Sequence, residues 1–187
     1  MIPTQITQWC HHFIRQHVQN GDLCIDATMG NGQDTALLCQ LVGETGHVLA
    51  FDIQEIALEN TKRRLEQQKV PDNYTLLLQS HVNMDAHAKP DSISCIMFNF
   101  GYLPGGDHAN ATQAGSSITA IKKGLSLLKK GGLMSLCIYS GGDTGFEERN
   151  TILDYIHTLD PHKYLVILSS YYNRPNHPPI PVLITRL

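Results

Sequence analysis

The stretch Ile25-Asp26-Ala27-Thr28-Met29-Gly30-Asn31-Gly32-Gln33-Asp34-Thr35 decides the fold of this chain. The apolar residues 23–25 predict a buried strand, and residues 35–41 predict the start of a helix, so the two glycines lie in the turn between them. Because glycine has no Cβ, the turn can adopt unusual dihedral angles and let a ligand approach its N–H groups closely. This segment indicates a strand–loop–helix unit that binds a nucleotide-like cofactor.

A second acidic residue follows at the spacing that such a cofactor site requires. Residues 47–51 predict the next strand, which ends at Asp52, about twenty residues after the glycines. A carboxylate in this place can accept hydrogen bonds from both hydroxyls of a ribose. A dinucleotide-binding loop would show a third glycine in the pattern G-x-G-x-x-G, whereas here Asp26 stands four positions before Gly30. The pattern disfavours a dehydrogenase and predicts a mononucleotide-binding βαβ unit.

The length and composition suit one α/β domain. A chain of 187 residues can bury a sizeable core but is short for two domains. Its hydrophobic content of 42% and charged content of 17% are typical of globular proteins, and we predict one domain over residues 1–187. The sequence contains neither a secretory signal pattern nor an apolar run long enough to span a membrane, which predicts a cytoplasmic protein with no membrane partner.

Cysteine usage and net charge limit the classes of function further. The five cysteines are odd in number and form no C-x-x-C pair, so we expect reduced thiols and neither a disulfide framework nor a zinc site. The formal net charge of −3 gives no general sign of nucleic-acid binding, so an RNA partner would have to meet a local basic patch. Helix-end lysines, however, are commonly just solvated. The candidates for such a patch are Lys122, Lys123, Lys129, Lys130, Arg174 and His177.

Helical and strand patterns alternate along the rest of the chain. A leading helix over residues 7–18 is predicted to cover either the edge of the sheet or the cofactor. Further helices are expected over residues 54–68, 116–128 and 146–159, and further strands over residues 74–78, 94–98, 133–139, 164–171 and 181–185. This alternation predicts an α/β, Rossmann-like fold: a seven-stranded, mainly parallel sheet with helices on both faces. No helical pattern separates the last two strands, so the last strand is expected to be antiparallel.

A glycine-rich segment, residues 99–108, follows the strand predicted over residues 94–98. Ligands of open α/β sheets bind beyond the carboxyl ends of the strands, so this loop should face the cofactor. Its first residues, Asn99-Phe100-Gly101-Tyr102, resemble the Asp/Asn-Pro-Pro-Tyr motif of amino methyltransferases, with Phe100 and Gly101 in place of the prolines. In that motif the first side chain orients the target amine and the aromatic ring stacks on a planar substrate. The alternative is a surface loop in which Asn99 only caps the strand.

The segment from Asp26 to Gly32 resembles motif I of the class I S-adenosylmethionine-dependent methyltransferases. Together with residues 51–54, Ser80-His81 and the block Gly101-Tyr102-Leu103-Pro104-Gly105-Gly106-Asp107, it is similar to a small bacterial family long described as rRNA methylases. Members of that family are understood as tRNA methyltransferases that convert 5-aminomethyl-(2-thio)uridine at the wobble position to its methylaminomethyl form. The similarity spans nearly the whole chain. It implies the class I methyltransferase fold, S-adenosylmethionine as cofactor, the tRNA anticodon stem-loop as partner, and suggests a homodimer.

The resemblance also implies roles for individual residues. The implied cofactor-binding residues are Asp26, Thr28, Gly30, Asn31, Gly32, Asp34, Thr35, Asp52, Ile53, Gln54, Ser80 and His81. The implied catalytic residues are Asn99, Tyr102, Asp107 and His108, and no metal ligand is implied. The implied substrate-binding residues are Phe100, Gly101, Leu103, Gly105, Gly106, Tyr139, Arg174 and Asn176. Asp107 and His108 are candidates to accept a proton, and their alternative is loop capping and a solvated imidazole.

Two segments depart from the family pattern. The family usually has a second histidine after the fifth strand, where this chain reads Tyr139-Ser140-Gly141-Gly142-Asp143-Thr144-Gly145, and it has Gln where this chain has Arg174. These departures keep two alternatives open: a methyltransferase with another acceptor, such as rRNA, a small amine or a protein side chain, and a cofactor-binding module without catalysis.

Overall fold

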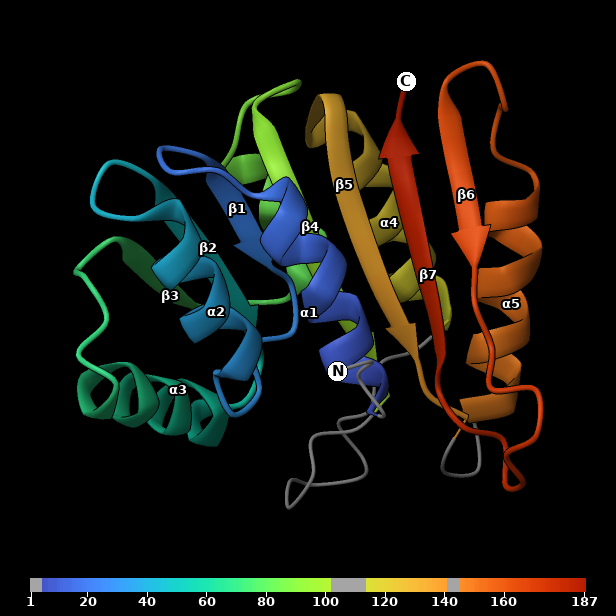
Figure 1. Ribbon diagram of the computed structural model, residues 1–187, viewed down its shortest axis with the longest axis horizontal. Coiled ribbons are helices and arrows are strands. Elements are labelled where there is room, and N and C mark those ends of the chain that lie inside the picture. The colour runs from blue at the N-terminus through green and yellow to red at the C-terminus, as the bar shows by residue number, and fades with distance from the viewer. Residues whose placement is uncertain (1–4, 102–113, 141–144) are drawn as a thin grey trace.

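The computed structural model describes residues 5–101, 114–140 and 145–187, which form a twisted sheet between two layers of helices (Figure 1). The strands are β1 (Leu23–Asp26), β2 (His47–Asp52), β3 (Tyr74–Leu78), β4 (Ile93–Phe100), β5 (Leu128–Ile138), β6 (Tyr164–Leu168) and β7 (Ile180–Arg186). The helices are α1 (Ile6–His17), α2 (Gln33–Val42), α3 (Glu55–Gln67), α4 (Ala114–Leu127) and α5 (Gly145–His157), with a short 3₁₀ helix, η1 (His81–Ala86).

The seven strands lie in the order β3-β2-β1-β4-β5-β7-β6. Strands β1 to β5 pair in parallel, whereas β7 pairs antiparallel with both β5 and β6. The chain moves outward from β1 to β3 and then crosses back to β4, which lies on the other side of β1. In open α/β sheets this reversal leaves a crevice beyond the carboxyl ends of the two central strands. The predicted fold, including the antiparallel last strand, is confirmed.

Alternating side chains of the strands build two cores, one on each face of the sheet. One core includes β-strand residues Cys24, Val48 and Cys95, and it is covered by α1, α2 and α3. The other includes Ile25, Leu49 and Ile96, and it is covered by η1, α4 and α5. The leading helix α1 packs Cys10, Ile14 and Val18 into the first core, so it covers a face of the sheet, over β5 and β7, rather than its edge.

Three details of the chain path differ from the sequence prediction. The sixth strand ends at Leu168 rather than at residue 171, and Tyr172 is 102% exposed, because the prolines and polar residues that follow favour a loop. The strand predicted from residue 133 already begins at Leu128, and its register with β4 shifts between Ile93 and Cys95. The short helix η1 was not predicted, since it is too short to show a helical period.

All five cysteines are buried free thiols. Among residues 5–101, 114–140 and 145–187, no helix is long and apolar enough to cross a membrane. The same residues contain no group of three or more histidine, cysteine or acidic side chains that could hold a metal ion.

Candidate functional site

Polar groups gather where β1, β2 and β4 end, at the edge of the sheet to which the β1 arrow points in Figure 1. Asp26 is the last residue of β1, Asp52 is the last residue of β2, and Asn99 is the penultimate residue of β4. The parallel pairing of these strands brings residues that are 73 positions apart in sequence to one place. The site that the sequence predicted from two separate motifs is therefore continuous at Asp26, Asp52 and Asn99.

The glycine loop is held in shape by helix α3. Gly30 and Gly32 have φ angles of 50° and 75°, in the left-handed region that favours glycine. A Cβ on Gly32 would lie 2.8 Å from the Cα of Thr61, so only glycine allows the loop to approach α3 this closely. The hydroxyl of Thr61 donates to the carbonyl of Gly30 at 3.1 Å, and Arg64 Nε donates to the carbonyl of Asn31 at 2.6 Å. These two α3 residues were not predicted, because each acts on a loop about thirty positions away.

Asp52 is hydrogen bonded to the same loop. Its Oδ2 accepts from the N–H of Gly30 at 3.0 Å, and its Oδ1 accepts from the N–H of Gln54 at 3.0 Å. Each carboxylate oxygen can accept a further hydrogen bond, so these contacts orient the side chain and leave it able to bind hydroxyl groups. The next residue, Ile53, leaves 55% of its surface exposed. An exposed apolar side chain beside an oriented carboxylate suits a ligand with an apolar ring next to a ribose.

Asp26 is completely buried between these groups. Its carboxylate accepts from the hydroxyl of Thr35 at 2.6 Å and from the N–H of Thr28 at 3.2 Å. Burial, followed by the negative charge of Asp34 and a smaller effect of Asp52, raises the pKa of Asp26 to about 7. Three neighbouring carboxyl groups create a negative potential that would favour a cationic ligand.

Asn99 joins β4 to the loop and to α2. Its backbone N–H donates to Thr28 Oγ1 at 2.7 Å, and its side-chain Nδ2 donates to Asp34 Oδ2 at 2.7 Å. The other oxygen of Asp34 lies 2.6 Å from Nε2 of His11, a residue of α1. An ionised carboxylate only accepts hydrogen bonds, so the amide nitrogen faces Asp34 and the amide oxygen is left to accept from a substrate. His11 was not among the predicted site residues, and no motif spacing in the sequence pointed to it.

His81 is the first residue of η1, which packs on the opposite face of the sheet from α2. The preceding Ser80 caps η1, because its hydroxyl oxygen accepts from the N–H of Val82 at 3.4 Å. Nδ1 of His81 donates to the carbonyl of Ala27 at 3.2 Å, whereas its buried Nε2 has no hydrogen-bond partner among the described residues. Burial lowers the pKa of His81, which favours a neutral ring with Nε2 as an acceptor. The ring also packs edge-on against Phe98. His81 thus offers a buried acceptor near the glycine loop.

The predicted substrate residues at the ends of β4 and β5 have different environments. The ring of Phe100 is completely buried and stacks on Phe98, so its side chain belongs to the core and only its backbone can face a substrate. Gly101 has a φ angle of 150°, and a Cβ there would lie 3.1 Å from Cβ of Tyr139. Burial, together with the neighbouring Cys137, raises the pKa of Tyr139 above its ordinary value, which keeps its hydroxyl neutral.

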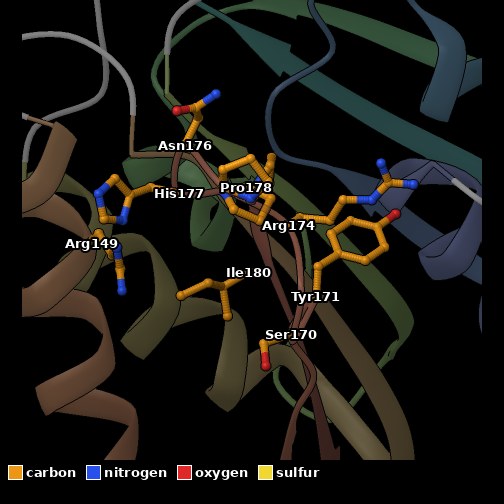
Figure 2. Close-up of a pocket in the computed structure, with 10 residues that line it drawn as sticks. Arg149, Ser170, Tyr171, Arg174, Asn176, His177, Pro178 and Ile180 are labelled. Carbon is orange, nitrogen blue, oxygen red and sulfur yellow. The ribbon is translucent and has the colours of Figure 1, made fainter.

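Arg174 and Asn176 lie apart from this cluster, in the loop between β6 and β7. They line a pocket of about 270 Å³ that also includes Arg149 of α5, Tyr171 and His177. Figure 2 shows Arg149 and His177 on one side of this pocket and Arg174 beside Tyr171 on the other. Asn176 and His177 have φ angles of 64° and 48°, a left-handed conformation in which Asn and His are several-fold enriched among non-glycine residues. Because β6 runs parallel to β1–β5, its following loop lies at the same edge of the sheet as Asp26 and Asn99.

The lysines proposed for an RNA patch do not share that location. Lys129 and Lys130 lie at the start of β5, which is the opposite edge of the sheet, and Lys129 pairs with Asp22 at 2.8 Å. Lys123 pairs with Asp85 at 2.8 Å and donates to the carbonyl of Val82. The prediction of one basic patch is therefore wrong for Lys129 and Lys130, because the sequence pattern did not show the direction of the strand that contains them. Six predicted residues lie outside the described residues: Tyr102, Leu103, Gly105, Gly106, Asp107 and His108.

Comparison with known proteins assigns this arrangement to a class. The model of a family described as "Putative rRNA methylase" matches residues 48–185. A chloroplastic tRNA (mnm(5)s(2)U34)-methyltransferase of Arabidopsis thaliana is 32% identical over 189 residues, which cover 96% of this chain and 69% of that protein. A Clostridium thermocellum protein with the same description as the family superposes with a TM-score of 0.96 at 40% identity, over 100% of both chains. A Streptococcus mutans protein described as a methyltransferase and crystallised in complex with SAH gives 0.89 at 36% identity, over 100% of both chains.

Proposed function

The chain belongs to the rRNA methylase family of methyltransferases, and from that premise we propose that it methylates the 5-aminomethyl group of (2-thio)uridine at the wobble position of tRNA. The Arabidopsis relative, which is named for this wobble nucleoside, aligns with 96% of the chain and supports the choice of acceptor. The observation that carries the proposal is the fixed amide of Asn99, because an oriented acceptor oxygen at the end of β4 suits an amine substrate.

The methyl donor is S-adenosylmethionine, which supplies a methyl group bound to a positively charged sulfur. The described residues fit this cofactor in three respects. Asp26 and its carboxyl neighbours provide negative charge at the end of β1, where the cationic methionine end would lie. Asp52 is oriented for a ribose, and Ile53 and His81 provide an exposed apolar side chain and a buried acceptor for an adenine. Five further residues of the implied set shape the glycine loop or orient its neighbouring carboxylates: Gly30, Asn31, Gly32, Thr35 and Gln54.

The role of the protein in the reaction is mainly orientation. The neutral amine of the nucleoside uses its nitrogen lone pair to form the new N–C bond, while the electron pair of the broken C–S bond stays on sulfur. Asn99 Oδ1 accepts from one N–H of the amine and thereby directs the lone pair toward the methyl group. Holding the reacting atoms in line removes much of the entropic barrier to transfer. Tyr102 would stack on the base, and Asp107 or His108 would accept a proton, with release to water as the alternative.

We place the RNA along the carboxyl edge of the sheet. The pocket lined by Arg149, Arg174, Asn176 and His177 adds cationic and amide groups to that edge. Arginine recognises phosphate oxygens well because its planar guanidinium donates several parallel hydrogen bonds. Such contacts would position the anticodon stem-loop, while Asn99 and the loop after β4 would select the modified nucleoside.

The experiment that tests the proposal is mass analysis of wobble nucleosides. Purified protein and S-adenosylmethionine are incubated with tRNA that carries 5-aminomethyl-2-thiouridine, and a gain of one methyl group on that nucleoside is expected. The Asn99→Ala variant should lose transfer by roughly a hundredfold or more while its affinity for S-adenosylhomocysteine stays nearly unchanged. No methyl gain, with cofactor binding intact, would contradict the wobble-uridine proposal and favour another acceptor or a non-catalytic role.

A further inference from the structure

The carboxylate of Asp34 connects the N-terminal helix to the end of β4. One of its oxygens accepts from Nδ2 of Asn99 at 2.7 Å, and the other lies 2.6 Å from Nε2 of His11. The side chains of Asp34 and His11 are only 9% and 19% exposed. Asp34 also lies in the first turn of α2, where a negative charge is favourable. Three elements, α1, α2 and β4, therefore meet at one carboxylate.

This contact decides which atom of the Asn99 amide faces the substrate. An asparagine amide can rotate by half a turn at little steric cost, and a rotated amide would present hydrogens instead of a lone pair to the amine. An ionised Asp34 accepts only, so it holds Nδ2 and leaves Oδ1 directed away from itself. Because water is largely excluded from Asp34, this hydrogen bond is electrostatically stronger than one in solvent.

His11 in turn fixes the carboxylate. The nitrogen 2.6 Å from Oδ1 must carry its hydrogen toward Asp34, so each carboxylate oxygen accepts from a different donor. Without His11, the carboxylate could turn toward another donor and loosen its hold on Asn99. The neighbouring His12 on α1 is exposed and instead contacts Gln16 at 3.1 Å, so it takes no part in this chain of contacts.

We propose that Asp34 and His11 are positioning residues for methyl transfer: through two successive hydrogen bonds they hold the Asn99 amide with Oδ1 toward the acceptor nitrogen. This inference rests on the proposed function, and it assigns Asp34 to the acceptor side of the site rather than to the cofactor. It also makes α1 a part of the active site as well as a cover for the sheet.

The kinetic test compares four variants with the wild-type protein on the tRNA substrate. Asp34→Asn and His11→Phe should lower kcat by roughly ten- to a hundredfold, because a misoriented group costs about that much. In His11→Phe, which leaves the charge of Asp34 in place, the KM for tRNA and the affinity for S-adenosylhomocysteine should change by less than about twofold. His11→Gln should recover most of kcat, since its amide presents an N–H donor at a similar distance from the backbone. His12→Phe is the matched control and should behave as wild type.

A second measurement, by NMR, does not depend on the substrate. The side-chain NH₂ signals of Asn99, assigned by their absence in Asn99→Ala, should exchange slowly with water in the wild-type protein, in His11→Gln and in His12→Phe. They should exchange markedly faster in His11→Phe. If wild type methylates no tRNA while this pattern holds, the proposed function fails and the positioning contacts stand. If the exchange rate of the Asn99 side-chain NH₂ is the same in His11→Phe as in the wild-type protein, the inference is wrong. It is also wrong if kcat falls as much in His12→Phe as in His11→Phe.

Discussion

The protonation of Asp26 depends on the charges around it, and the stability of the protein should depend on pH for that reason. Burial and the charges of Asp34 and Asp52 raise its pKa from 3.8 in the unfolded chain to about 7 in the folded protein. A raised pKa means that the folded state binds the proton more tightly, so this contribution to stability is present below about pH 4 and is lost as the pH rises to about 7. This rise in pKa contributes at most about 4 kcal/mol to the free energy of unfolding.

Asp26→Asn should therefore become more stable relative to wild type as the pH rises. We expect the difference in the free energy of unfolding between the two proteins to grow between pH 4 and 7 and then to level off. Urea unfolding at several pH values measures this difference, and other titrating groups cancel because both proteins contain them. If the unfolding free energies of the two proteins change in parallel between pH 4 and 7, Asp26 is ionised throughout this range. The control Asp154→Asn, at an exposed position of α5, should leave the dependence of the unfolding free energy on pH unchanged.

Helix α3 and the glycine loop form a unit whose tight contact can be tested at one position. In Gly32→Ala the new Cβ meets the backbone of Thr61 at 2.8 Å, and the φ angle of 75° is unfavourable for alanine. The left-handed conformation costs about 1–2 kcal/mol and the overpacking about 1–3 kcal/mol. We expect a loss of about 3 kcal/mol in unfolding free energy, with a clear loss of affinity for S-adenosylhomocysteine, measured by urea unfolding and by calorimetric titration.

Gly131 provides the matched control for that substitution. Its φ angle is 78°, nearly that of Gly32, but a Cβ there would have no atom within 4 Å. Gly131→Ala should show only the conformational cost, about 1 kcal/mol, and unchanged cofactor affinity, because it lies at the opposite edge of the sheet. Equal effects of the two substitutions would mean that the contact between the loop and α3 contributes nothing.

The elements that the sequence predicted well are those with a strong local signal. Buried strands such as β4 appear as apolar runs, and α2 begins where two glycines and an apolar period meet. The elements that it missed or misplaced have a weak local signal. The six-residue η1 shows no period, and the residues after Leu168 alternate like a strand although prolines follow. For η1 the contacts with α4 and β2 decide the conformation, whereas after Leu168 the prolines outweigh the alternating pattern.

At the scale of the whole molecule, the sequence indicates motifs but does not indicate which distant side chains contact them. Asp26, Asp52 and Asn99 were found because each follows a strand, and parallel strands bring their carboxyl ends to one edge. His11 was missed because its contact with Asp34 joins residues of two helices whose packing no local pattern encodes. Lys130 and Arg174 looked equivalent as cations, and only the strand directions show that they lie at opposite edges.

This difference in location gives a prediction for RNA binding. Arg174→Gln and Lys130→Gln each remove one positive charge from an exposed position, at the carboxyl edge and the opposite edge respectively. If the anticodon stem-loop lies along the carboxyl edge, Arg174→Gln should weaken binding, and the slope of log affinity against log salt should become smaller by about one. Lys130→Gln should leave both quantities nearly unchanged, because Lys130 lies at the opposite edge of the sheet. It is the matched control, since the two variants have the same net charge. Fluorescence anisotropy of a labelled stem-loop at increasing salt measures both. Equal salt slopes in the two variants would indicate that the net charge governs the affinity and that Arg174 contacts no phosphate. A loss of RNA affinity confined to Arg174→Gln would place the RNA over the loop between β6 and β7.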